Sequence, residues 1–248
     1  MRSIGVIPAR FDSKRLPGKP LALIDNKPLI QHVWQRAKMA TLLDDVIVAT
    51  DDERILSKVE EFGGKCVMTS SDIRSGSDRV AEVAKGSQAD IVMNIQGDEP
   101  FIEPALINAV VGAFDEHGTE MVTAIRRADA EDDIPNPNLV KVVFDEDWNA
   151  LNFSRTPIAD DKENSSPGHW IHLGIYGYTR DFLLKFTDMD QTPMELSESL
   201  EQLRVIENGY KIKLVQTEYR SFPIDTESDL IRANEEFEKY ALEEAGAL

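Results

Sequence analysis

The chain has 248 residues, of which 42% are hydrophobic and 29% charged, enough for one large globular domain or a domain with a sizeable insertion. Its 45 acidic residues outnumber its 27 basic residues, and the net charge of −18 argues against nonspecific binding to nucleic acid or to an anionic membrane. The single cysteine, Cys66, excludes an intramolecular disulfide and a multi-cysteine metal site. No stretch approaches the ~20 apolar residues of a membrane span, so we expect a cytoplasmic protein that acts on a small molecule.

Short apolar runs with a β-branched bias alternate with longer amphipathic runs in the first part of the chain. The pattern predicts buried strands at 4–9, 45–50, 90–97, 121–125 and 139–144, and helices at 27–40, 52–63 and 78–86. This alternation predicts an α/β fold with a mostly parallel central sheet flanked by helices.

The pattern changes after residue 148. Residues 154–170 lack periodicity and predict a loop. The sequence then predicts strands at 171–178 and, at an edge, 211–219, and helices at 196–209 and 226–246. Because no repeat and no Pro/Ser-rich linker interrupts the chain, we expect residues 1–248 to form a single α/β domain with a smaller insertion for substrate binding.

A basic turn, "RLPGKP" at residues 15–20, follows the first predicted strand. Ligands of open parallel sheets bind at the carboxyl ends of strands, which is where this turn is expected. Arg10, Arg15 and Lys19 would neutralise phosphate oxygens there, and Gly18 would let the backbone approach a ligand closely. The alternative is a solvated basic turn, because the segment matches neither GxxxxGK[ST] nor GxGxxG.

Polar residues follow later strands in the same way. Asp98 in "QGDEP" and Asp225 before the last helix suit Mg²⁺ ligands, although both also suit helix caps. In "RSGSDR", Arg74 and Ser77 suit a nucleobase or ribose, although a serine there also caps the next helix. The shared order of these segments, each after a strand, favours one common ligand site.

These segments resemble those of a known family in order and spacing. "PARFDSKRLPGKPL", "RSGSDR", "NIQGDEP", "HLGIYGY", "LEQLR" and "IDTESDL" are similar to motifs of the 3-deoxy-manno-octulosonate cytidylyltransferases, the CMP-Kdo synthetases of lipopolysaccharide biosynthesis. The resemblance spans nearly the whole chain. It implies a nucleotide-diphospho-sugar transferase-like fold, a homodimer, and transfer of CMP from CTP to the anomeric hydroxyl of Kdo with release of pyrophosphate.

The resemblance also implies a role for each matching position. Lys19, Arg15 and Asp98 match catalytic residues, and Asp98 and Asp225 match Mg²⁺ ligands. The matches to nucleotide-binding residues are Arg10, Arg15, Lys19, Arg74, Ser77 and Asp98. The matches to sugar-binding residues are Gln96, Arg155, His172, Tyr176, Glu201 and Gln202. Without the resemblance, a histidine such as His172 in an apolar strand is more often a core residue.

The segment after Arg155 departs from the family pattern, because Asp160, Asp161 and Glu163 stand where aromatic or basic residues are usual. Carboxylates beside a sugar pocket favour an ammonium group, so the acceptor is either Kdo or its 8-amino-8-deoxy analogue, Kdo8N. In the alternative, these carboxylates form a solvated loop of an ordinary Kdo enzyme. The rival functions are a CMP-sialic acid synthetase-like enzyme, another sugar nucleotidyltransferase, or a noncatalytic nucleotide-binding module.

Overall fold

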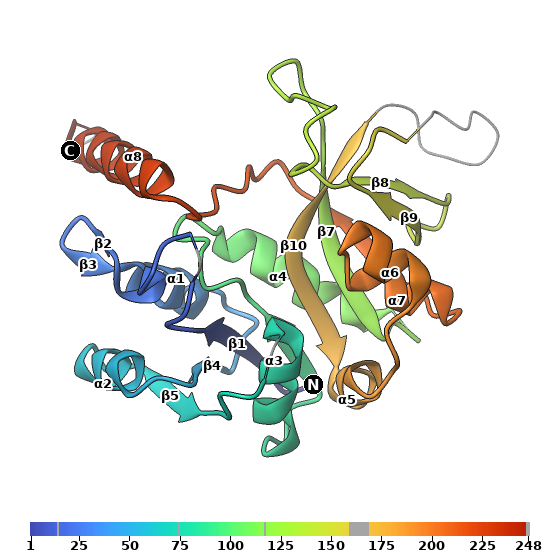
Figure 1. Ribbon diagram of the computed structural model, residues 1–248, viewed down its shortest axis with the longest axis horizontal. Helices are drawn as coiled ribbons and strands as arrows, with labels where there is room; N and C mark the ends of the chain where they lie inside the picture. Colours follow the sequence, from blue (N-terminus) through green and yellow to red (C-terminus); the bar gives the residue numbers. More distant parts are fainter. Residues whose placement is uncertain (14, 74, 117, 159–168, 247–248) are drawn as a thin grey trace.

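The computed structural model describes residues 1–13, 15–73, 75–116, 118–158 and 169–246, and within them nine strands form one sheet. Seven of these strands follow the order β11-β7-β10-β6-β1-β4-β5, and β8 and β9 extend from β10. β10 (Trp170–Thr179) runs antiparallel to β6 and β7, which it separates, whereas the other neighbours along this path are parallel. The predicted α/β fold with a mostly parallel sheet is confirmed (Figure 1).

The first half of the sheet holds β1 at its centre. The strands here are β1 (Ser3–Ala9), β4 (Asp45–Thr50), β5 (Lys65–Met68) and β6 (Ile91–Asn94). The helices here are α1 (Leu29–Lys38), α2 (Glu53–Glu61) and α3 (Gly76–Lys85), and α1 is preceded by the 3-10 turn η1 (Lys19–Leu21) and the short strands β2 (Leu23–Ile24) and β3 (Lys27–Pro28). Because β1 and β6 are parallel, the loops that follow them emerge at one edge of the sheet.

The second half carries most of the elements after residue 100. Its strands are β7 (Met121–Arg127), β8 (Lys141–Phe144), β9 (Ala150–Ser154) and β11 (Lys213–Gln216). Its helices are α4 (Pro104–Gly112), η2 (Ala113–Asp115), α5 (Arg180–Thr187), α6 (Pro193–Glu198), α7 (Gln202–Glu207) and α8 (Glu227–Gly246). β11 is an edge strand, as predicted. The prediction of one helix over 196–209 is wrong, because Ser199 has a left-handed backbone with φ of 52° that separates α6 from α7.

Two apolar clusters cover the two faces of the sheet. Val6 and Val92 belong to one cluster, whereas Ile7 and Met93 belong to the other. Successive strand residues point to opposite faces, so a strand that is covered on both sides needs apolar residues at consecutive positions. This explains why β1 and β6 appear in the sequence as continuous apolar runs rather than as alternating ones.

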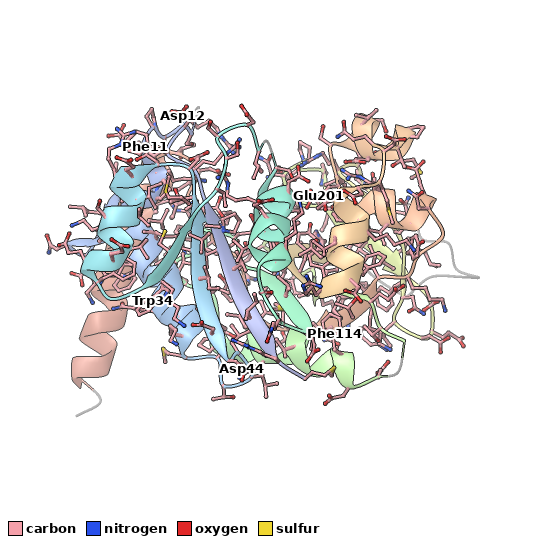
Figure 2. The ribbon with its side chains drawn as sticks, turned by 90° about the horizontal axis from the view of Figure 1, so that it is seen from below. Phe11, Asp12, Trp34, Asp44, Phe114 and Glu201 are labelled. Carbon is pink, nitrogen blue, oxygen red and sulfur yellow. The ribbon has the colours of Figure 1, made fainter. Side chains whose placement is uncertain are left out.

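The two ends of the parallel strands lie at opposite ends of the molecule. Figure 2 shows Phe11 and Asp12, which follow β1, at one end, and Asp44 and Phe114 at the other. At the first end the loop after β6 crosses close to β1, because a Cβ atom on Gly97 would lie 2.7 Å from the carbonyl oxygen of Pro8. Only glycine permits this approach, which sets the position of the next residue, Asp98.

Candidate active site

Contacts to Phe11 fold the basic loop that follows β1. The Phe11 carbonyl oxygen accepts hydrogen bonds from Ser13 N at 3.0 Å and Gly18 N at 3.1 Å. Gly18 has a φ of 69°, in the left-handed region, and a Cβ atom there would lie 3.1 Å from the Phe11 ring. The guanidinium of Arg54 lies 3.3 Å from the centroid of the same ring. This packing returns the loop to the carboxyl end of β1, where η1 begins at Lys19.

Two carboxylates from distant parts of the sequence converge on Lys19. Lys19 Nζ lies 2.8 Å from Asp98 Oδ2 and 3.1 Å from Asp225 Oδ1, and Arg15 Nη2 lies 2.9 Å from Asp225 Oδ1. Burial acts to lower the pKa of the Lys19 ammonium, but the two carboxylates outweigh it and raise that pKa above its ordinary value. The site therefore holds a permanent positive charge between two negative ones.

These residues line a cavity of about 890 Å³ at the edge where β1 and β6 end. The predicted site residues that line it are Arg10, Arg15, Lys19, Gln96, Asp98 and Asp225, and they are joined by residues such as Ser75, Gly76 and Arg79. Arg74 lies outside the described residues. The structure thus brings together the predicted phosphate-binding and metal-binding residues that it describes, and it places them at the edge of the sheet where a ligand was expected.

Three of the six predicted sugar-binding residues lie instead in the interior. His172, Tyr176 and Gln202 are 9%, 7% and 1% exposed, and Tyr176 OH donates to Gln202 Oε1 at 3.4 Å. The predicted nucleotide-binding residue Ser77 is also buried, and its hydroxyl donates to Glu201 Oε1 rather than lining the cavity. Burial raises the pKa of both Tyr176 and Glu201.

His172 occupies the core position that its apolar strand alone suggested. Its Nε2 atom lies 3.0 Å from Thr123 Oγ1, whose hydroxyl also faces the carbonyl oxygens of Leu173 and Ile175 at 3.2 and 2.7 Å. The 2.7 Å contact with Ile175 O favours assigning the threonine proton to that carbonyl, and in this tautomer His172 Nε2–H donates to the threonine oxygen. Burial lowers the pKa of His172 to about 3, so the ring is neutral at physiological pH.

Arg155 is held by backbone carbonyls. Its guanidinium donates to Glu198 O at 2.7 Å, Pro137 O at 3.0 Å and Ser199 O at 3.2 Å, and its backbone N–H donates to Glu198 Oε2 at 2.9 Å. Arg155 therefore fixes the end of α6 against the segment before β8. The residues Asp160, Asp161 and Glu163, on which the Kdo8N hypothesis depends, lie outside the described residues.

Arg79 is a site residue that the sequence reasoning missed. It is 1% exposed, yet it lines the cavity and forms an ion pair with Asp51 at 2.6 Å and a hydrogen bond with Thr69 Oγ1. A buried arginine of this kind joins the loops after β4 and β5 to the first turn of α3. The signal was present in "RSGSDR", whose second arginine begins an apolar helix and so must be buried with a partner or turned to solvent.

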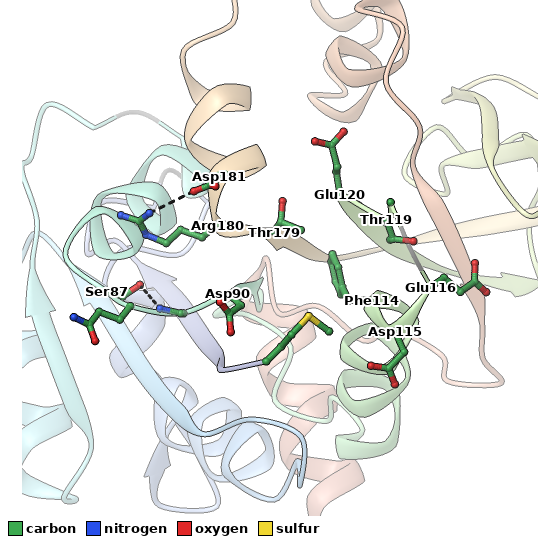
Figure 3. Close-up of a pocket in the computed structure, with 14 residues that line it drawn as sticks. Ser87, Asp90, Phe114, Asp115, Glu116, Thr119, Glu120, Thr179, Arg180 and Asp181 are labelled. Carbon is green, nitrogen blue, oxygen red and sulfur yellow. Dashed lines mark hydrogen bonds and ion pairs between the residues drawn. The ribbon is translucent and has the colours of Figure 1, made fainter.

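A second cavity, of about 990 Å³, lies at the opposite end of the sheet (Figure 3). Carboxylates dominate the charge of its lining, among them Asp90, Glu116, Glu120 and Asp181. The one arginine of the lining, Arg180, donates to the carbonyl oxygens of Ala84 at 2.9 Å and Lys85 at 3.3 Å. This cavity repels phosphates, whereas the cavity around Lys19 carries Arg10 and Arg15 as well as the lysine, which makes it the candidate nucleotide site.

A family model described as cytidylyltransferase matches residues 4–212. The chain belongs to this cytidylyltransferase family. The 3-deoxy-manno-octulosonate cytidylyltransferase of Solibacter usitatus is 48% identical over 245 residues, which cover 98% of this chain and 97% of that protein. The enzyme of the same name from Pelobacter propionicus is 49% identical over 249 residues, which cover 96% and 98%. The family resemblance in the sequence motifs is therefore confirmed.

One solved structure belongs to the same family, and another shares the fold. A CMP:2-keto-3-deoxy-manno-octonic acid synthetase in complex with CTP is 38% identical, with a TM-score of 0.90, and the match covers 97% of this chain and 100% of that one. The 4-diphosphocytidyl-2C-methyl-D-erythritol synthase of Anaerococcus prevotii is 16% identical, with a TM-score of 0.62, covering 96% and 98%. At that identity the second likeness concerns the fold alone. The nucleotidyltransferase-like fold expected for this cytidylyltransferase is thus confirmed.

Proposed function

We propose that this cytidylyltransferase transfers CMP from CTP to the anomeric hydroxyl of Kdo and releases pyrophosphate. The observation that carries the proposal is the convergence of Lys19, Asp98 and Asp225 at the edge of the sheet, in a chain whose net charge is −18. A triphosphate needs local positive charge in such a chain, and Arg15 and Lys19 supply it. The names of relatives of 48% and 49% identity support Kdo as the acceptor.

The reaction requires positioning and charge neutralisation rather than a protein nucleophile. The anomeric oxygen attacks the α-phosphorus in line, so that an O–P bond forms and the bond to the bridging oxygen of the pyrophosphate breaks. The hydroxyl proton is lost to solvent, and the negative charge of the departing pyrophosphate grows. Lys19 and Arg15 line the cavity and would bind that charge with charge-assisted hydrogen bonds.

The two carboxylates also fit the Mg²⁺ ion that we propose as the cofactor. Mg²⁺ prefers oxygen ligands and is commonly held by one or two carboxylates together with substrate phosphates. Asp98 and Asp225 already share one cationic nitrogen, that of Lys19, which marks the point between them as favourable for positive charge. Asp98 and Asp225 would hold the ion, and bound Mg²⁺ would polarise the α-phosphate and neutralise its oxygens.

The acceptor is proposed to enter beside Gln96, the one predicted sugar-binding residue that lines the cavity among those described. Tyr176, Glu201 and Gln202 lie next to this region through their contact with Ser77 and with one another. Tyr176 and Gln202 are buried, so a sugar would reach them only if the surrounding side chains moved. A homodimer and a cytoplasmic location remain further proposals. None of the described helices combines the length and hydrophobicity that a membrane crossing requires.

A pyrophosphate-release assay tests the function and the choice of sugar together. Purified protein with CTP, Mg²⁺ and Kdo should release pyrophosphate, UTP in place of CTP should give slower release, and removal of Mg²⁺ by EDTA should stop it. A noncatalytic nucleotide-binding module would release none with any sugar. Side-by-side kinetics on Kdo and Kdo8N decide the acceptor. Faster turnover of Kdo8N than of Kdo would show that Kdo8N is the preferred acceptor.

A further inference from the structure

The segment that delivers Asp225 to the site, residues 217–224, contains neither helix nor strand. It begins where β11 ends at Gln216 and continues to α8, which starts at Glu227. No sheet ladder therefore fixes its path, and the position of Asp225 depends on side-chain and loop contacts. We call residues 217–224 the strap.

We propose that Glu99 is a positioning residue that ties the strap to the Asp98 loop and so sets the distance between the two carboxylates of the site. The effect of this tether on catalysis rests on the proposed function. The contact between the strap and the Asp98 loop can be measured without any substrate.

The contacts of Glu99 all point to the strap rather than to the nucleotide cavity. Glu99 Oε2 accepts hydrogen bonds from Tyr219 OH at 2.9 Å and from Phe222 N at 3.2 Å, and Oε1 accepts one from Ser221 Oγ. The Glu99 side chain is 9% exposed and does not line the cavity that holds Lys19. A buried carboxyl with three donors from four consecutive residues binds that segment in one position.

A backbone contact completes the tether next to the catalytic carboxylates. Ile224 N donates to Asp98 O at 2.9 Å. The Asp98 loop itself is fixed independently, by β6 and by the close approach of Gly97 to Pro8 O. Loss of the Glu99 carboxyl would therefore leave Asp98 in place and loosen the strap, so that Asp225, which follows the strap directly, depends on its remaining contacts with Lys19, Arg15 and Asp229. The position of Asp225 relative to Lys19 and a bound Mg²⁺ would then be less fixed than that of Asp98.

The test compares Glu99→Ala and Glu99→Gln in the full chain. Removing a residue that orients a metal ligand typically costs about 10- to 100-fold in metal affinity or activity. We expect Glu99→Ala to raise the half-saturating Mg²⁺ concentration within that range and to lower kcat. Glu99→Gln keeps one oxygen acceptor and should recover part of the loss. Tyr219→Phe removes one donor and provides a milder variant if Glu99→Ala does not fold.

Two readouts separate this role from simple destabilisation. Because Glu99 acts through Asp225, Glu99→Ala should have little further effect on turnover in an Asp225→Asn background. Hydrogen exchange of the strap amides should rise in Glu99→Ala without any ligand. The matched control is Glu195→Gln, which disrupts another buried carboxyl, the partner of Arg204, and should leave the Mg²⁺ dependence and the strap unchanged.

Independent effects of Glu99→Ala and Asp225→Asn on turnover, or unchanged hydrogen exchange of the strap, would overturn the inference. If the wild-type protein released no pyrophosphate while Glu99→Ala still loosened the strap, the proposed function would fail and the tether would stand. If the wild-type protein were active and the strap were unaltered in Glu99→Ala, the tether would fail and the proposed function would stand.

Discussion

At Lys19, one ammonium nitrogen contacts carboxylates that come from residues 98 and 225 of the chain. An ammonium group has three donors, of which Asp98 and Asp225 use two, so one remains to face a ligand in the cavity. The same cation keeps the two carboxylates from repelling each other. Lys19 therefore organises the pair in the absence of substrate and offers a hydrogen bond to a phosphate oxygen in its presence.

We predict that Asp98→Asn and Asp225→Asn each lower kcat/KM for CTP roughly 100-fold or more, because metal binding supplies several kcal/mol of charge stabilisation. Both variants should remain folded, since each leaves Lys19 one carboxylate partner. Initial rates of pyrophosphate release at several Mg²⁺ concentrations measure the effect. Asp181→Asn, an exposed aspartate at the far end of the sheet, is the control. Full Mg²⁺-dependent turnover in Asp98→Asn would contradict the assignment.

The loop after β6 depends on the small size of Gly97. A Cβ atom at this position would lie 2.7 Å from Pro8 O, a backbone atom that cannot rotate away. We predict that Gly97→Ala moves the Asp98 loop, lowers the thermal midpoint and lowers turnover by more than the change in stability explains. Gly86→Ala is the matched control, because its Cβ would be 3.8 Å from Val83 O in an ordinary helical conformation. Equal activity of the two variants would show that the close approach does not control the site.

The sequence predicted those features that depend on short runs of neighbouring residues. The apolar runs of β1, β4 and β6 and the positions of Asp98 and Asp225 could be read from the chain. The break at Ser199 could not, because serine has no strong preference for the left-handed conformation that it adopts there. The burial of His172 was suggested by its apolar strand, but its contact with Thr123 was beyond a local pattern. It depends on β10 lying between β6 and β7, a long-range pairing that periodicity does not reveal.

Over the whole molecule, negative charge and the basic site act in opposite directions. The net charge of −18 repels anionic ligands, and only a concave site with its own cations reverses that field locally. The cavity that holds Arg15 and Lys19 meets this requirement, whereas the cavity of Figure 3 adds to the repulsion. CTP is thereby directed to one end of the sheet by charge as well as by shape.

Stability in acid is a whole-molecule property that a single buried group should influence here. Burial lowers the pKa of His172 to about 3 in the folded protein, against 6.5 ordinarily. Between these values the unfolded chain takes up a proton that the folded chain does not, so unfolding becomes easier as pH falls from about 6.5 towards 3. His172 alone contributes a slope of up to about 1.4 kcal/mol per pH unit.

We predict that His172→Gln, whose amide can still donate to Thr123 Oγ1, flattens this part of the curve of unfolding free energy against pH. This holds even if the substitution lowers stability at pH 7. Urea unfolding at several pH values measures the slope. His169→Gln, at an exposed histidine, should keep the wild-type slope, and an equal slope in His172→Gln would show that His172 becomes protonated without loss of the fold.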